Sequence, residues 1–200
     1  MKANTASIFI IICLLTSSCI SQKKMFVLQN QSFLNYTISY GEDQFDCAVE
    51  VVNRRPYALL NYTCSNAKNS TGQINISVDA LQSAKEQDHQ LEGEKEDYIN
   101  KTAFWVSTDV FDSLKLGLVV EMPYRQGFML NNFRYKLIEN RDVFVNVNDK
   151  DEVFSCLYVE DVGGMGFQYC IWDNRNEPLI LRMKTTLELT LNQVQVTEKK

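Results

Sequence analysis

The cysteines beyond residue 25 lie symmetrically about two turn signals, and this arrangement constrains the fold more than any other feature. Cys47 and Cys64 flank a break at residues 53–56, and Cys156 and Cys170 flank the glycine-rich residues 163–166. Strand-like runs border both breaks. Directly opposed residues of an antiparallel hairpin have Cα atoms about 4.5 to 5.5 Å apart, within reach of a disulfide. The sequence therefore predicts disulfides Cys47–Cys64 and Cys156–Cys170.

Other interpretations of these cysteines stay open. Four cysteines allow three connectivities, and four buried free thiols are a further alternative. A zinc site is disfavoured, because the chain has no C-x-x-C motif and a single histidine. We expect no metal and no other cofactor. Disulfides also require an oxidising compartment, and a chain reaches one only if it is exported. Whether the N-terminal segment is an export signal therefore bears on both predictions.

Residues 1–18 have the composition of a cleaved export signal. Lys2 precedes an apolar run at residues 8–15, and small residues follow it. The run is shorter than the roughly 20 residues that a membrane-spanning helix needs. The sequence predicts a signal peptide and export across a membrane.

The end of this signal resembles a bacterial lipobox, in which a cysteine is acylated with chains such as palmitate. Small residues precede Cys19, although Leu15 lies four residues before it and Thr16 occupies the usual leucine position. A polar, basic segment follows. We expect lipidation of Cys19, a tether at residues 19–25 and attachment to a membrane, since a diacyl anchor holds a protein stably. The alternative is that Cys19 is only a small residue near a cleavage site.

A second alternative is a secreted eukaryotic glycoprotein. Six asparagines stand in N-x-S/T frames, which are acceptors for N-glycosylation. They are Asn30, Asn35, Asn61, Asn69, Asn75 and Asn100. Asparagine side chains also stabilise turns, which would explain several of these positions without a glycan.

The remaining chain, residues 26–200, is long enough for one domain with its own core. The full chain has a net charge of −5 at pH 7. No long run of Lys or Arg occurs, which argues against nucleic acid and against an anionic lipid surface as partners.

Strand-like segments dominate both ends of this domain. Turn signals at residues 41–43 and 148–151 suggest hairpins, and breaks are expected at residues 131–132 and 139–142. Between the ends lies a weak repeat, in which residues 76–84 match residues 106–114. Each copy has a strand, at residues 73–76 or 103–106, before a serine that can cap a helix. The sequence predicts an antiparallel, β-rich α+β domain with short helices beginning near Ser77 and Ser107.

No catalytic motif is present. A serine or cysteine hydrolase needs a base beside its nucleophile, usually histidine. His89 lies in a polar stretch after the first expected helix, so we expect a solvated surface imidazole. Carboxylates cluster at residues 92–97, 149–152 and 160–161, where loops are expected and charge is ordinary. We predict no catalytic residues.

Aromatic side chains are the remaining candidates for a binding site. A cleft lined by some of them could hold sugar, peptide or lipid, although core packing is the simpler explanation for any one. These residues are Trp105, Tyr124, Phe128, Tyr135 and Trp172.

Residues 173–183 contain an Asp/Asn turn followed by Asn176-Glu177-Pro178-Leu179-Ile180-Leu181-Arg182, and a leucine-rich segment comes after. This pattern is similar to uncharacterised cell-envelope lipoproteins of Bacteroidota, and the similarity extends to residues 72–84 and 101–114. The resemblance implies a lipid-anchored envelope protein and supplies no activity. We therefore expect a non-enzymatic binding or structural module, periplasmic or surface-facing, with an unknown protein or glycan partner. A hydrolase acting on envelope polymers is the alternative.

Overall fold

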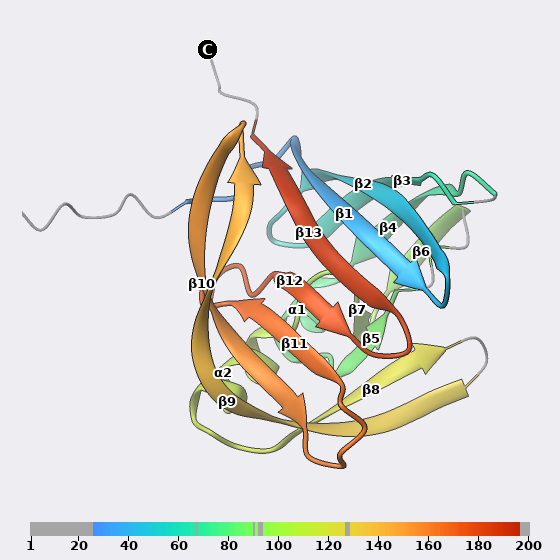
Figure 1. The fold of residues 1–200 in the computed structure, drawn as a ribbon. Coiled ribbons are helices and arrows are strands. Elements are labelled where there is room, and N and C mark those ends of the chain that lie inside the picture. Colours follow the sequence, from blue (N-terminus) through green and yellow to red (C-terminus); the bar gives the residue numbers. More distant parts are fainter. Residues whose placement is uncertain (1–25, 67, 90, 92–93, 127–128, 197–200) are drawn as a thin grey trace, which may run out of the picture.

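Strands make up most of the protein, and they hydrogen-bond into one strongly curved sheet (Figure 1). The computed structural model describes residues 26–66, 68–89, 91, 94–126 and 129–196. Over these ranges the strands are β1 Ser32–Tyr40, β2 Asp43–Asn53, β3 Ala58–Cys64, β4 Thr71–Ile76, β5 Glu86–Asp88, β6 Glu94–Tyr98, β7 Lys101–Thr102, β8 Val120–Gln126, β9 Met129–Val147, β10 Lys150–Asp161, β11 Gln168–Trp172, β12 Ile180–Lys184 and β13 Glu188–Gln195. The helices are α1 Val78–Ser83 and α2 Thr108–Lys115. The expected α+β class, dominated by antiparallel strands, is confirmed.

The strands lie in the order β6-β4-β3-β2-β1-β13-β12-β11-β10-β9-β8-β5-β7. Neighbours consecutive in sequence pair antiparallel, whereas β4–β6, β5–β7 and β5–β8 pair parallel. The end of β13 also pairs with β9, through Gln193↔Asn146 and Val194↔Val147. Strands β9 to β13 therefore form a closed ring, and β1 to β4 with β6 extend from it as an open wing.

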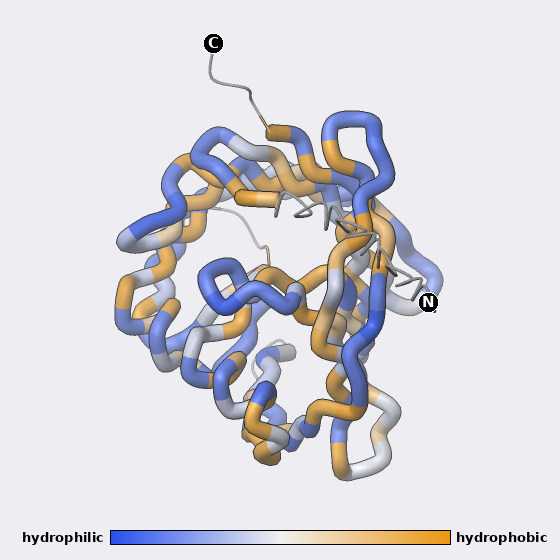
Figure 2. Tube along the Cα trace, turned by 90° about the vertical axis from the view of Figure 1, so that its left-hand side faces the viewer, coloured by the Kyte–Doolittle hydropathy of each residue, from blue (hydrophilic) through white to orange (hydrophobic). Residues whose placement is uncertain are grey.

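Alternating hydrophobicity decides which face of each strand points inward. In β1 the side chains of Leu34, Tyr36 and Ile38 are buried, and the residues between them are half-buried. Figure 2 shows the same alternation of hydrophobic and hydrophilic residues along other strands. The inward faces merge into one hydrophobic core that joins both parts of the sheet.

The long strand β9 corrects an expectation, because residues 131–132 and 139–142 do not break it. Residues 131–132 stay paired with β8 and residues 139–142 stay paired with β10, where a bulge at Tyr158/Val159 absorbs the change of register. The turn expected after β9 is present. Asn148 and Asp149 both adopt positive φ, 48° and 65°, which asparagine and aspartate tolerate better than most residues.

Both expected helix caps are confirmed. The Ser77 hydroxyl accepts a hydrogen bond from the backbone N–H of Ala80 at 3.1 Å, and the Ser107 hydroxyl accepts one from Val110 at 3.4 Å. The helices lie side by side, and Gln82 of α1 donates to Asp109 of α2 at 2.7 Å. Within the described residues, no helix is long and apolar enough to cross a membrane.

The strand expected at residues 103–106 is wrong. β7 ends at Thr102, and only Trp105 makes an isolated bridge, to Leu179. The reason is the backbone of Phe104, whose φ of 64° turns the chain out of the extended conformation. The two copies of the repeat thus share their helix caps but not their strands.

Candidate ligand-binding pocket

A pocket of about 530 Å³ opens where the β2–β3 turn meets α1, the segment that leads into α2 and the loop between β11 and β12. Four segments that are distant in sequence form it. Its lining comprises Arg54, Arg55, Pro56, Ala58, Val78, Leu81, Gln82, Trp105, Val106, Thr108, Asn176, Glu177 and Pro178. The wall is thus mostly apolar, with a small group of charged and amide side chains.

The turn of the backbone at Phe104 places Trp105 in this wall. The Phe104 ring enters the core and lies 5.0 Å from the Tyr36 ring, while Trp105 lines the pocket and is 4 % exposed. The Val106 N–H donates to the Pro178 carbonyl at 3.0 Å. This bond and the Trp105↔Leu179 bridge hold residues 105–106 against the loop that carries Glu177.

Glu177 is a buried carboxylate beneath two arginines. Its side chain is 4 % exposed, and its Oε1 atom lies 2.7 Å from Arg54 Nη1 and 3.8 Å from Arg55 Nε. The Arg54 guanidinium also donates to the Leu28 carbonyl, and Arg55 donates to the Asn176 carbonyl. Oε1 nevertheless accepts no hydrogen bond of good geometry, so the 2.7 Å contact is an ion pair without an aligned N–H.

Burial and charge act on Glu177 in opposite directions. Burial raises the pKa of this carboxyl group, and Arg54, Arg55 and the Trp105 side chain lower it, with burial the larger effect. The arginines differ in exposure, since the side chain of Arg54 is 24 % exposed and that of Arg55 is 55 % exposed. Arg55 is therefore the charged group of the pocket that faces solvent.

The aromatic residues expected to line a cleft mostly belong to the core. Tyr124, Tyr135 and Trp172 are at most 5 % exposed, and Phe128 lies outside the described residues. Trp105 alone of these candidates lines the pocket described above. Sequence reasoning missed Arg54, Arg55 and Glu177, because Arg54 and Arg55 stand in a turn signal and nothing near Glu177 signals burial.

The expectation of a solvated His89 is wrong. The side chain is 6 % exposed, and its ring lies 5.9 Å from that of Phe104 and 6.2 Å from that of Tyr124. Neither ring nitrogen has a hydrogen-bond partner. Burial lowers the pKa of His89 to about 4, although the neighbouring Asp88 opposes this shift.

The polar residues before His89 form a buried strand, which explains the error. Asp88 lies 2.6 Å from Lys101 Nζ, Glu86 lies 2.8 Å from the Arg125 guanidinium, and the Gln87 side chain is buried and donates to Thr102 at 2.8 Å. These partners come from β7 and β8. A charged sequence can be buried when other strands neutralise its charges, and local sequence does not show such partners.

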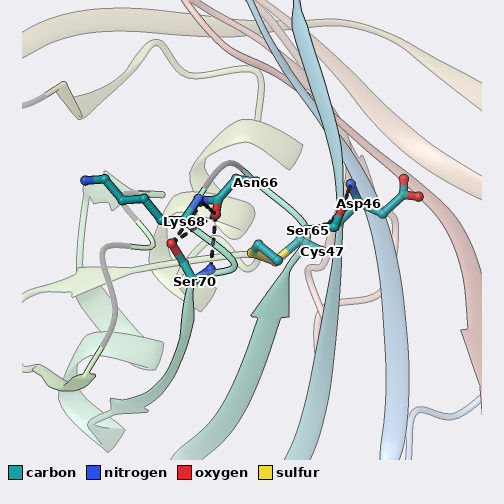
Figure 3. Close-up of a disulfide and its surroundings, with 7 residues drawn as sticks. Asp46, Cys47, Ser65, Asn66, Lys68 and Ser70 are labelled. Atoms are coloured by element: carbon teal, nitrogen blue, oxygen red, sulfur yellow. Dashed lines mark hydrogen bonds between the residues drawn. A yellow bond between two sulfur atoms is a disulfide. The ribbon is translucent and has the colours of Figure 1, made fainter.

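The first expected disulfide is present. Register places Cys47 directly opposite Cys64, with Cα atoms 4.0 Å apart and the sulfurs bonded. Figure 3 shows the turn that follows Cys64, in which Asn66 Oδ1 accepts a hydrogen bond from the Ser70 N–H at 3.0 Å. Next to the disulfide, the Ser65 hydroxyl accepts one from the Asp46 N–H at 3.1 Å.

The second expected disulfide is not formed, and Cys156 and Cys170 are buried free thiols. The predicted direct opposition is wrong, because register pairs Cys156 with Trp172 and Tyr158 with Cys170. The cysteines are thus diagonal neighbours. Their mutual hydrogen bond, together with burial, raises the pKa of Cys156, which stays a protonated donor.

The other candidates lie apart from the pocket. Cys19 and the signal peptide are outside the described residues, as is Glu92 of the first carboxylate cluster. Asn35, Asn61 and Asn75 lie on strands, half-buried, and donate to Gln193, Glu50 and Asp97. The other N-x-S/T asparagines, Asn30, Asn69 and Asn100, are exposed between strands.

Comparison with known proteins gives no relative. No family model matches the chain, and neither a curated protein nor a solved structure matches it. Among the described residues, no three His, Cys, Asp or Glu side chains are grouped so that they could hold a metal ion. The pocket is therefore interpreted from its own chemistry.

Proposed function

We propose that this protein is a lipid-anchored module of the cell envelope that binds a ligand without chemical turnover. The sequence pattern of residues 1–25 supports export and lipidation at Cys19 in this proposal. The binding site in this proposal is the pocket around Arg55, Trp105 and Glu177.

The observation that carries the binding role is the carboxylate of Glu177, which is buried beside two arginines in the lining of the pocket. Removing such charges from water is expensive, and replacing a buried ion pair by apolar residues often stabilises a protein. Charges kept in a concave, mostly apolar site are typical of ligand recognition. The Glu177 carboxylate would orient the guanidinium groups above it.

The pocket favours a ligand with an apolar body and one anionic group. Arg54 and Arg55 carry two positive charges against the single charge of an ionised Glu177, which leaves a net positive charge. The exposed Arg55 can pair with a carboxylate in a bidentate manner. Val78, Leu81 and Trp105 offer an apolar wall for the rest of the ligand.

The position of His89 argues against the hydrolase alternative. The only histidine of the chain is enclosed by Phe104 and Tyr124, and a general base must reach the group that it deprotonates. We expect His89→Ala to lower stability, and we expect no turnover of envelope polymers to depend on this residue.

Thermal-shift binding with a panel of carboxylates tests the pocket. Suitable probes are N-acetyl dipeptides, short fatty acids and sugar acids. We expect at least one class to raise the melting temperature of the wild type and of the control Arg182→Ala, an exposed arginine outside the pocket. Arg55→Ala should lose this shift. Equal shifts in Arg55→Ala, or none with any probe, would contradict the binding role.

Intact-mass spectrometry of the mature protein tests the anchor. We expect an N-terminus at Cys19 that carries acyl chains.

The second candidate is a secreted glycoprotein, favoured because none of the six N-x-S/T asparagines is fully buried. An unacylated N-terminus beyond Cys19 together with mass lost on N-glycosidase treatment would support that candidate instead.

A further inference from the structure

An exposed apolar loop follows α2. Leu116, Leu118 and Val119 are 76 %, 53 % and 50 % exposed, and no charged residue occurs from residue 116 to residue 120. Single exposed apolar side chains are ordinary, but three within four consecutive residues form a continuous apolar surface. We name residues 116–119 the apolar loop.

This loop is connected to the start of the described chain through a few direct contacts. The Phe26 ring lies 5.6 Å from the Trp172 ring, and the next residue, Asp173, binds Lys115 Nζ at 2.8 Å. Lys115 is the last residue of α2 and directly precedes Leu116. A short series of direct contacts thus links the first described residue to the apolar loop; in Figure 1 the described chain starts at the upper left, and the segment after α2 lies at the lower left.

The length of the preceding segment limits the distance to a membrane. Residues 19–25 reach about 25 Å even when fully extended. If Cys19 is acylated, the bilayer surface lies within this distance of Phe26. A tether of this reach allows the domain to lie against the bilayer with the apolar loop turned toward the lipid.

We propose that the apolar loop inserts into the lipid bilayer and fixes the orientation of the domain on it. This inference rests on the proposed lipid anchor at Cys19. The anchor supplies the affinity, and Leu116, Leu118 and Val119 supply a second contact that limits rotation about the tether. Insertion places apolar side chains in the region where interfacial segments bury them.

Charges around the loop indicate that the contact is apolar rather than electrostatic. Lys85 and Arg134 lie on one pocket surface with Leu118, and so do Asp109 and Glu121. The two positive charges are balanced by two negative ones. The contact should therefore be insensitive to salt and to the fraction of anionic lipid.

Hydrogen exchange on the full acylated protein tests this contact. The protein is reconstituted into vesicles of phosphatidylethanolamine and phosphatidylglycerol, and exchange is compared with that in detergent-free buffer for the Cys19→Ser protein. We expect the amides of residues 116–119 to exchange more slowly on vesicles by more than about tenfold, because burying two leucines favours the inserted loop by at least that factor.

Two variants make the test specific. Leu116→Ser/Leu118→Ser should float with vesicles as the wild type does but lose the protection of the loop. The control Tyr40→Ser/Ile99→Ser removes two apolar side chains that are 55 % and 71 % exposed. Tyr40 ends β1, at the opposite end of that strand from the start of the chain. This control should keep the protection.

The outcomes separate the two proposals. Flotation of the wild type without loop protection overturns the inserted loop and leaves the anchor standing. Failure of the wild type to float overturns both. Protection that appears without vesicles and rises with protein concentration would show a second copy of the chain on the loop, and would also overturn the bilayer contact.

Discussion

The two cysteine hairpins have similar sequence patterns and different outcomes. In the β2–β3 hairpin Cys47 lies opposite Cys64 and the sulfurs are bonded. In the β10–β11 hairpin Cys156 lies opposite Trp172, so Cys170 is its diagonal neighbour and both thiols are free.

The difference shows how sensitive a cross-strand bond is to register. The cysteines of the second hairpin are symmetric about residue 163, whereas the observed pairs are symmetric about residue 164. Directly opposed residues are closer than diagonal ones, which are about 7 to 8 Å apart. A displacement of one residue in the centre of a turn therefore decides whether a hairpin is covalently closed.

Removing the Cys47–Cys64 bond should have the largest effect on stability. The bond joins residues 17 apart in sequence, and the chain-entropy treatment gives about 3 kcal/mol for a loop of this size. We expect Cys47→Ala/Cys64→Ala to lose that amount in urea denaturation. Cys156→Ala/Cys170→Ala is the matched pair and should lose less, only the packing of two sulfurs. Equal losses would contradict the comparison.

Acid should destabilise the fold through His89, which lies outside the disulfide-bonded hairpin. The folded pKa of about 4 lies below the ordinary value of 6.5, so the unfolded chain binds the proton first as pH falls. The contribution of His89 to the free energy of unfolding is fully present above pH 6.5. It is lost as pH falls toward 4, by at most about 3 kcal/mol.

Urea midpoints between pH 7 and pH 4 measure this slope. The variant His89→Phe, which has no titrating ring, should show a flatter curve over the same range. Parallel curves for the two proteins would refute the role of His89.

The two serine caps give a smaller effect and extend the comparison to the helices. Loss of a cap costs about 1 kcal/mol. Ser107 is fully buried, and its bond to Val110 is buried, whereas the bond from Ala80 to Ser77 is partly buried. We expect Ser107→Ala to lower the melting temperature more than Ser77→Ala. The reverse order, measured by calorimetry, would count against this assignment of burial.

The smallest expected effect is none at all. In the Cys47→Ala/Cys64→Ala background, reductant should leave the melting temperature unchanged, because Cys156 and Cys170 are thiols. Non-reducing peptide mapping supplies the direct measurement. A peptide that joins Cys156 to Cys170 would show that the second hairpin also closes.

Features that depend on a few neighbouring residues could be predicted from the sequence. Ser77 and Ser107 cap helices because a cap involves residues only three apart. Asn148 and Asp149 form a turn for the same reason. The β-rich class followed from alternation along single strands.

Tertiary structure alone decided which polar groups are buried and where the pocket lies. His89 and Glu177 occur in polar stretches, and both are buried because aromatic rings or arginines from distant segments enclose them. The pocket joins four segments between residues 54 and 178. Local sequence determines backbone conformation through neighbours, whereas burial depends on packing partners that no neighbouring residue specifies.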